Sequence, residues 1–223
     1  MTLHIGLLLY PGLTQLDLTG PFELLHRVPN SVVHLVWKDL EIVVADSGLG
    51  IRPTTRMAEC PPLDVLMVPG GFGQVALMED AETIDFIKRQ GEAARWVTSV
   101  CTGALLLGVA GLLRGYEATT HWRYVELLPI FGAIPKEGRV VVDRNRMTGG
   151  GVTAGIDFGL RLVAELTDPM TACALELALE YDPEPPFRSG HPRIADPSLV
   201  ARVTAELEKR VEARGVQIGR ALR

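Results

Sequence analysis

Long hydrophobic runs and clusters of basic residues are both missing from this 223-residue sequence. No apolar stretch approaches the ~20 residues that a membrane-spanning helix needs. Twenty-two lysines and arginines against 27 acidic residues give a net charge of −5, which argues against nucleic acid or an anionic membrane as the main partner. The N-terminus begins directly as a strand-like segment without a signal-peptide pattern, so we expect a cytoplasmic protein.

The patterns of a disulfide framework, a metal site and a nucleotide site are missing as well. The three cysteines form no Cys-x-x-Cys pair, and so small and odd a number does not build a disulfide framework. The five histidines show no metal-ligand spacing, so we expect no metal. The glycine-rich segments lack the full dinucleotide-binding fingerprint, which argues against a nicotinamide cofactor.

The sequence does contain a globular composition and an alternation of strand-like and helix-like segments. Hydrophobic residues make up 47% and charged residues 22%, so a chain of this length can bury a sizeable core. Strands are predicted at residues 3–9, 32–37, 42–45, 63–68, 96–100, 118–120 and 140–143, and helices at 21–27, 81–90, 102–110, 152–163 and 170–180. This alternation predicts an α/β fold with a mostly parallel sheet, whose ligands bind beyond the carboxyl ends of the strands.

The C-terminal part of the chain differs in composition from the rest. Residues 182–197 hold five of the fifteen prolines, so we divide the chain into an α/β domain at 1–181 and a second segment at 182–223. Asp196 and Pro197 predict the start of a helix with a narrow apolar stripe, formed by Leu199, Val203, Leu207 and Val211. Such a helix either lies on its own domain or reaches over a dimer partner, and the sequence favours neither.

Cys101 is the strongest candidate for a reactive residue. The segment Ser99-Val100-Cys101-Thr102-Gly103 places it between a β-rich run and a helix, where a nucleophile elbow projects the side chain over the sheet. The free N–H groups and positive dipole end of the helix lower the pKa of a thiol from its reference value of about 8.5. Cys60 lies in a loop without activating neighbours, and Cys173 lies in an apolar helix and is expected in the core.

Asp17 and His121 are candidate partners of the cysteine. Asp17 follows the first strand between two leucines, and an acid in apolar surroundings has a raised pKa unless it is paired. Alternatively, Asp17 caps the helix expected after Gly20. His121 stands in a strand-end loop past the cysteine and is either a catalytic partner or a polar loop residue.

Backbone N–H groups of glycines are candidates for binding a developing anion. Gly70 and Gly71 follow a predicted strand, after Pro69, and could offer their N–H groups to a developing anion. Gly150, in a run of three glycines, fits the same role or plain close packing.

Together these residues resemble the DJ-1/PfpI superfamily, and within it the isonitrile (isocyanide) hydratases. The resemblance covers nearly the whole chain and rests on residues 15–21, 61–65, 98–103, 118–122, 148–158 and 180–187. The last of these segments, Glu180-Tyr181-Asp182-Pro183-Glu184-Pro185-Pro186-Phe187, is the most specific to the hydratase branch.

The resemblance implies a flavodoxin-like three-layer α/β sandwich, similar to class I glutamine amidotransferases, in a homodimer without metal or organic cofactor. It also implies Cys101 as the nucleophile, Asp17 as the general acid/base and Thr102 as a supporting hydrogen-bonding residue. The implied activity adds water to a small-molecule isonitrile, R–NC, to give the N-formamide through a thioimidate on Cys101. PfpI-type proteases carry a histidine directly after the cysteine, and Thr102 in that position counts against a protease.

Other roles for the same cysteine stay open. In a redox-sensing or chaperone-like protein, Cys101 would be oxidised to a sulfinate. A glyoxalase-like or amidase enzyme would use the same thiol to attack another substrate. Regulators of the AraC type carry similar segments together with a helix-turn-helix region. Because the chain stops at Arg223, we expect that a regulatory role is disfavoured.

Overall fold

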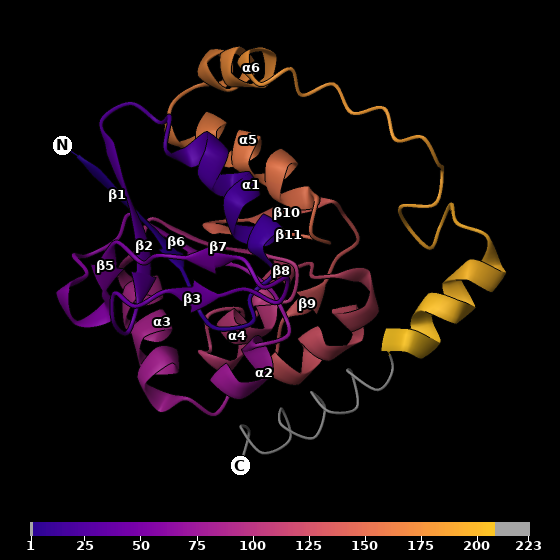
Figure 1. Ribbon diagram of the computed structural model, residues 1–223, viewed down its shortest axis with the longest axis horizontal. Helices are drawn as coiled ribbons and strands as arrows, with labels where there is room; N and C mark the ends of the chain where they lie inside the picture. The colour runs from indigo at the N-terminus through magenta and orange to yellow at the C-terminus, as the bar shows by residue number, and fades with distance from the viewer. Residues whose placement is uncertain (1, 208–223) are drawn as a thin grey trace.

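The computed structural model describes residues 2–207 and contains a seven-stranded sheet covered by helices on both faces (Figure 1). The strand order is β10 (Val140–Asp143), β11 (Arg146–Gly149), β7 (Trp96–Val100), β6 (Val65–Val68), β1 (Leu3–Leu8), β2 (Ser31–Trp37) and β5 (Thr55–Arg56). Strands β10 and β11 are antiparallel, and every other neighbouring pair in the sheet is parallel. The mostly parallel α/β sheet predicted from the sequence is confirmed.

The central strands are buried on both faces. Every residue of β6 and β7 is buried, which matches their continuous apolar or small-residue sequences. Two short pairs lie outside the main sheet: β3 (Val43–Val44) with β4 (Gly50–Ile51), and β8 (Glu117–Ala118) with β9 (Ile134–Pro135). The strand predicted at residues 42–45 is therefore a hairpin arm rather than part of the sheet.

Helices form a layer on each side of the sheet, as Figure 1 shows. One layer holds α1 (Gln15–Leu25) and α5 (Ala154–Leu166), with α6 (Pro169–Ala178) on their outer side. The other holds α2 (Gln74–Leu77), α3 (Ala81–Ala93) and α4 (Gly103–Val109), and two 3₁₀ segments are η1 (Met57–Glu59) and η2 (Trp122–Phe131). The three layers confirm the flavodoxin-like sandwich.

Helix α1 begins six residues before the start predicted at Pro21, and this prediction was wrong. The chain turns into the helix at Thr14, whose carbonyl accepts a hydrogen bond from the Asp17 N–H at 3.0 Å. Pro21 lies inside the helix with its ring against α5, where a Cβ on Gly155 would stand 3.1 Å from the proline Cδ. Asp17 is thus a first-turn helical residue and not a cap.

Helix α6 is not the core helix that its apolar sequence predicts. Ala172 is its one buried residue, and Cys173 is exposed, which contradicts the expected core position. The physical reason is that α6 packs on the outer side of α5 rather than on the sheet (Figure 1). The strand β11, missed in the sequence, runs buried beside β7.

Beyond α6 the chain runs without regular structure to a helix at residues 197–207 (Figure 1). Asp196 caps this helix as predicted, because its Oδ1 accepts a hydrogen bond from the Ser198 N–H at 2.8 Å. Leu199, Val203 and Leu207 of the apolar stripe are partly buried, whereas Val211 lies outside the described residues. The domain division at residue 181 stays a prediction. No helix within residues 2–207 has the length and apolar character to cross a membrane.

Candidate active site

The carboxyl ends of three neighbouring strands bring the candidate residues together. Strand β1 leads to Asp17 in α1, β6 leads to Gly70, and β7 leads to Cys101 and Thr102 before α4. These strands are adjacent and parallel in the order β7-β6-β1, so the segments that follow them meet at one edge of the sheet.

Cys101 occupies a strained turn between β7 and α4. Its φ of 54° is left-handed, a conformation that costs a side-chain-bearing residue about 1–2 kcal/mol. The turn is held from both sides: the Cys101 N–H donates to the carbonyls of Gly149 (3.1 Å) and Gly150 (2.8 Å), and its carbonyl accepts from Thr120 Oγ1 (2.7 Å). The residue is 6% exposed. This geometry is that of a nucleophile elbow.

Two glycines allow the segments around the turn to approach closely. A Cβ on Gly103 would stand 2.1 Å from the Val68 carbonyl oxygen, so α4 can begin against β6 only with glycine at this position. A Cβ on Gly70 would stand 2.7 Å from Asp17 Oδ2 and 2.6 Å from the Thr102 nitrogen. Gly70 therefore lies between the acid and the start of the helix.

Asp17 is fully buried and hydrogen-bonded to the thiol side chain of Cys101. Its Oδ2 also accepts a hydrogen bond from the Gly70 N–H at 2.9 Å. Burial raises the pKa of Asp17 from 3.8 to about 7, against the lowering effect of the Gly70 and Cys101 hydrogen bonds, and Asp46 raises it further. The carboxyl group therefore changes between acid and base near neutral pH, as an acid/base catalyst needs.

The glycine N–H groups proposed as anion donors each have an acceptor within the protein. Gly70 donates to Asp17, Gly71 donates to Thr102 Oγ1 at 3.2 Å, and Gly150 donates to the Arg139 carbonyl at 2.9 Å. In this arrangement Gly70 and Gly71 hold the acid and the buried Thr102 in place. Their role as anion donors stays a prediction.

His121 lies beside the site as the cap of η2. Its Nδ1 accepts a hydrogen bond from the Arg123 N–H at 3.3 Å, which is a capping contact. Its Cδ2 lies 3.5 Å from the position of a Cβ on Gly151, so the ring adjoins the glycine turn that holds Cys101. The capping bond agrees with the polar-loop interpretation, and a catalytic role is not tested by it.

Sequence reasoning missed two buried hydroxyl groups that support the site. Thr120 holds the Cys101 carbonyl, and Tyr10 donates from Oη to the Pro69 carbonyl at 2.9 Å, directly before Gly70. Both residues are almost fully buried, with exposed fractions of 2% and 0%. In the sequence, Thr120 stands out only within a family motif and Tyr10 only as the first residue of a turn. Neither pattern reveals what the hydroxyl group contacts.

No cluster of metal ligands accompanies this site. Among residues 2–207, no three histidine, cysteine, aspartate or glutamate side chains gather as metal ligands would. The expectation that the site works without metal or organic cofactor rests on the sequence patterns and the resemblance.

Comparison with known proteins supports the resemblance stated above. The isonitrile hydratase of Pseudomonas putida is 56% identical over 200 residues, which cover 90% of this chain and 88% of that protein. The HTH-type transcriptional regulator GbdR of Pseudomonas aeruginosa is 32% identical over 168 residues, or 71% of this chain and 45% of the regulator. A crystal structure of a ThiJ/PfpI family protein from Pseudomonas syringae superposes with a TM-score of 0.96 at 44% identity, covering 98% of this chain and 91% of that one. The sequence model of the DJ-1/PfpI family matches residues 4–165, and this chain belongs to that family.

Proposed function

We propose that the protein is an isonitrile hydratase, which adds water to R–NC and releases the N-formamide R–NH–CHO. The observation that carries the proposal is the buried pair of Asp17 and Cys101, in which a carboxyl group with a pKa of about 7 hydrogen-bonds a thiol. An isonitrile needs both a nucleophile and a proton at the same terminal carbon, and this pair supplies both. The 56% identity to the Pseudomonas putida hydratase supports the same activity.

In the first step the Cys101 thiolate attacks the terminal carbon, and Asp17 as carboxylic acid delivers its proton to that carbon. A C–S bond and a C–H bond form, and the C≡N triple bond becomes a double bond. The product is a neutral thioimidate, R–N=CH–S–Cys101, beside the Asp17 carboxylate. The two groups share one proton in the resting state, so they titrate as a coupled pair.

In the second step water adds to the thioimidate carbon. One water proton goes to the imine nitrogen, and the Asp17 carboxylate takes the hydroxyl proton as the C–S bond breaks. The formamide leaves, and the thiolate and carboxylic acid are restored. Proton transfer of this kind contributes about 10² to 10⁴ in rate.

The hydrogen bonds of the glycine turns fit this chemistry. No full oxyanion forms in either step, because the carbon is protonated first and the later hydroxyl group loses its proton only as the thiolate leaves. The N–H groups of Gly70 and Gly71 can therefore position Asp17 and Thr102 instead of binding an anion. Thr102 acts in this proposal by fixing the turn through its bond to Gly71.

Turnover of p-nitrophenyl isocyanide, followed spectrophotometrically as formamide forms, tests the proposal. We expect turnover by the wild type and none above background by the Cys101→Ala variant. Cys173→Ala is the matched control, because it removes an exposed thiol on α6 and should keep full activity. Folded wild-type protein without turnover would refute the hydratase, and equal turnover by Cys101→Ala would refute covalent catalysis.

A redox-sensing or glyoxalase-like protein is the second candidate, since each would use the same cysteine. Two measurements discriminate: the intact mass of the protein after peroxide treatment, which reports oxidation of Cys101, and the turnover of methylglyoxal. Oxidation to the sulfinate or methylglyoxal turnover, without isonitrile turnover, would favour these functions.

We further propose that two copies form a cytoplasmic homodimer. Large apolar side chains of α6 and the segment after it support this, because Met170, Leu177 and Phe187 are 76%, 83% and 77% exposed. Light scattering should give twice the chain mass of 24.3 kDa for the wild type and a smaller mass for Leu177→Glu. A wild type that stays at the mass of one chain would refute the dimer.

A further inference from the structure

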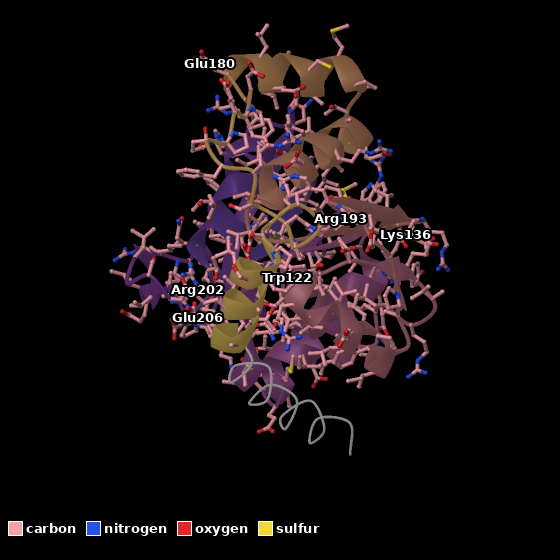
Figure 2. The ribbon with its side chains drawn as sticks, turned by 90° about the vertical axis from the view of Figure 1, so that its right-hand side faces the viewer. Trp122, Lys136, Glu180, Arg193, Arg202 and Glu206 are labelled. Carbon is pink, nitrogen blue, oxygen red and sulfur yellow. The ribbon has the colours of Figure 1, made fainter. Side chains whose placement is uncertain are left out.

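A small cavity lies between the C-terminal helix and the 3₁₀ segment η2. Its volume is about 120 Å³, and its lining includes Trp122, His191, Ala195, Leu199, Val200 and Val203. Figure 2 shows Trp122 beside the helix at residues 197–207, with Arg202 and Glu206 on the opposite side of that helix. Burial lowers the pKa of His191, helped by Arg193, so at neutral pH this side chain adds no charge to the apolar lining.

The aromatic wall of the cavity, Trp122, is connected along the chain to a residue that contacts Cys101. Trp122 follows His121, and their ring centroids are 5.5 Å apart. His121 in turn borders Gly151, and Thr120 before it holds the Cys101 carbonyl at 2.7 Å. One residue, His121, therefore separates Thr120, which contacts the Cys101 carbonyl, from Trp122 in the wall of the cavity.

The other wall of the cavity lies outside the part of the chain that matches the family. The family match ends at residue 165, whereas the wall is formed by residues 189–203. Cys101 and Asp17 lie within the matched part. An extra wall beside a shared reactive turn can select a substrate without changing the chemistry of the turn.

The shape and polarity of an isonitrile match such a cavity. The C–N–R atoms are collinear, so the R group projects straight away from the reacting carbon and must enter a neighbouring space. An alkyl or aryl R group offers no hydrogen bond and is best bound by an uncharged, apolar lining. A cavity of about 150 Å³ lined by apolar side chains is known to bind benzene, so one of about 120 Å³ suits an R group up to about the size of one ring.

We propose that the cavity between Trp122 and the C-terminal helix binds the apolar R group of the isonitrile and sets its permitted size. This inference rests on the proposed hydratase function and adds a specificity site to it. The residues of the helix act on binding of the R group and take no part in the chemical steps at Cys101.

Filling the cavity tests the inference with two substrates of different size, methyl isonitrile and phenyl isonitrile. Ala195→Leu and Val203→Phe each add apolar volume to the lining. For both variants we expect kcat/KM for phenyl isonitrile to fall at least about tenfold, mainly through KM, because a misfit of one methylene already costs about 10- to 200-fold. The kcat/KM for methyl isonitrile should stay within about twofold of the wild type.

Arg202→Ala is the matched control, since this exposed residue lies on the same helix away from the cavity (Figure 2). This variant should leave kcat/KM unchanged for both substrates. Equal losses of kcat/KM for both substrates, or unchanged selectivity in both filling variants, would overturn the cavity assignment. Turnover of methyl isonitrile by the same proteins would still support the hydratase function. If either filling variant fails to fold by circular dichroism, the other decides. A wild type that hydrates neither isonitrile would overturn the hydratase and the cavity assignment together.

Discussion

Replacing Asp17 with asparagine should change how protein stability depends on pH. The carboxyl group has a pKa of about 7 in the folded protein and 3.8 as its ordinary value, so between these values only the folded state keeps the proton. The stability that the protonated Asp17 carboxyl group contributes is therefore fully present below pH 3.8 and is lost as the pH rises towards 7. A difference of about 3 pKa units corresponds to about 4 kcal/mol of unfolding free energy, at 1.36 kcal/mol per unit.

The assay is urea unfolding at several values between pH 4 and pH 8, in a Cys101→Ala background that removes the coupled thiol. The free energy of unfolding of Asp17→Asn minus that of its parent should rise by about 4 kcal/mol across this range, since asparagine does not titrate. Asp85→Asn controls for the change in net charge, because it alters an exposed carboxylate on α3. The difference in unfolding free energy between Asp85→Asn and its parent should change by no more than about 0.5 kcal/mol across the same pH range.

A flat difference for Asp17→Asn would refute the reasoning. It would mean that the acid ionises in the folded protein as easily as in the unfolded chain, so burial would not govern its protonation. A difference that falls with pH would reverse the sign and point to a carboxylate stabilised by its hydrogen bonds.

Three further predictions concern the same site. Isonitrile turnover should fall about tenfold per pH unit above pH 7, where Asp17 loses its proton, and a flat profile to pH 9 would remove Asp17 as the acid. Gly70→Ala should lower kcat at least about tenfold by displacing Asp17, while Gly20→Ala, whose Cβ would stand 3.5 Å from Ile156, should keep activity and stabilise α1 by about 0.5–1 kcal/mol. Thr120→Val should cost about 1 kcal/mol in urea unfolding and slow alkylation of the thiol, and an unchanged alkylation rate would limit Thr120 to a structural role.

Much of the fold could be predicted because the buried parallel strands carry strong local patterns. The predicted bounds of β7 and β10 coincide with the structure, since each is a compact β-rich run between turn residues. Strand β11 was missed because Arg146-Met147-Thr148-Gly149 has little β-branched character, and its burial comes from its neighbours. The start of α1 was misplaced because Pro21 usually marks a first turn, whereas here its ring packs on α5.

The candidate site divides in the same way between local and long-range information. The elbow geometry at Cys101 could be predicted because an elbow is a local pattern of strand, turn and helix. The raised pKa of Asp17 followed from its apolar neighbours, but its hydrogen bonds to Gly70 and Cys101 join parts of the chain far apart in sequence. Thr120, Tyr10 and the cavity beside Trp122 depend on such long-range contacts and carry no local signal.

The left-handed backbone of Cys101 bears on directed evolution of this protein. Glycine tolerates a φ of 54° without the penalty that any side chain brings, so a Cys101→Gly chain is relieved of strain while it loses the proposed nucleophile. A library sorted for heat resistance alone would then enrich inactive chains at this position. Such a library needs a screen for activity in every round, because selection for stability favours glycine at position 101 whereas the proposed activity requires cysteine.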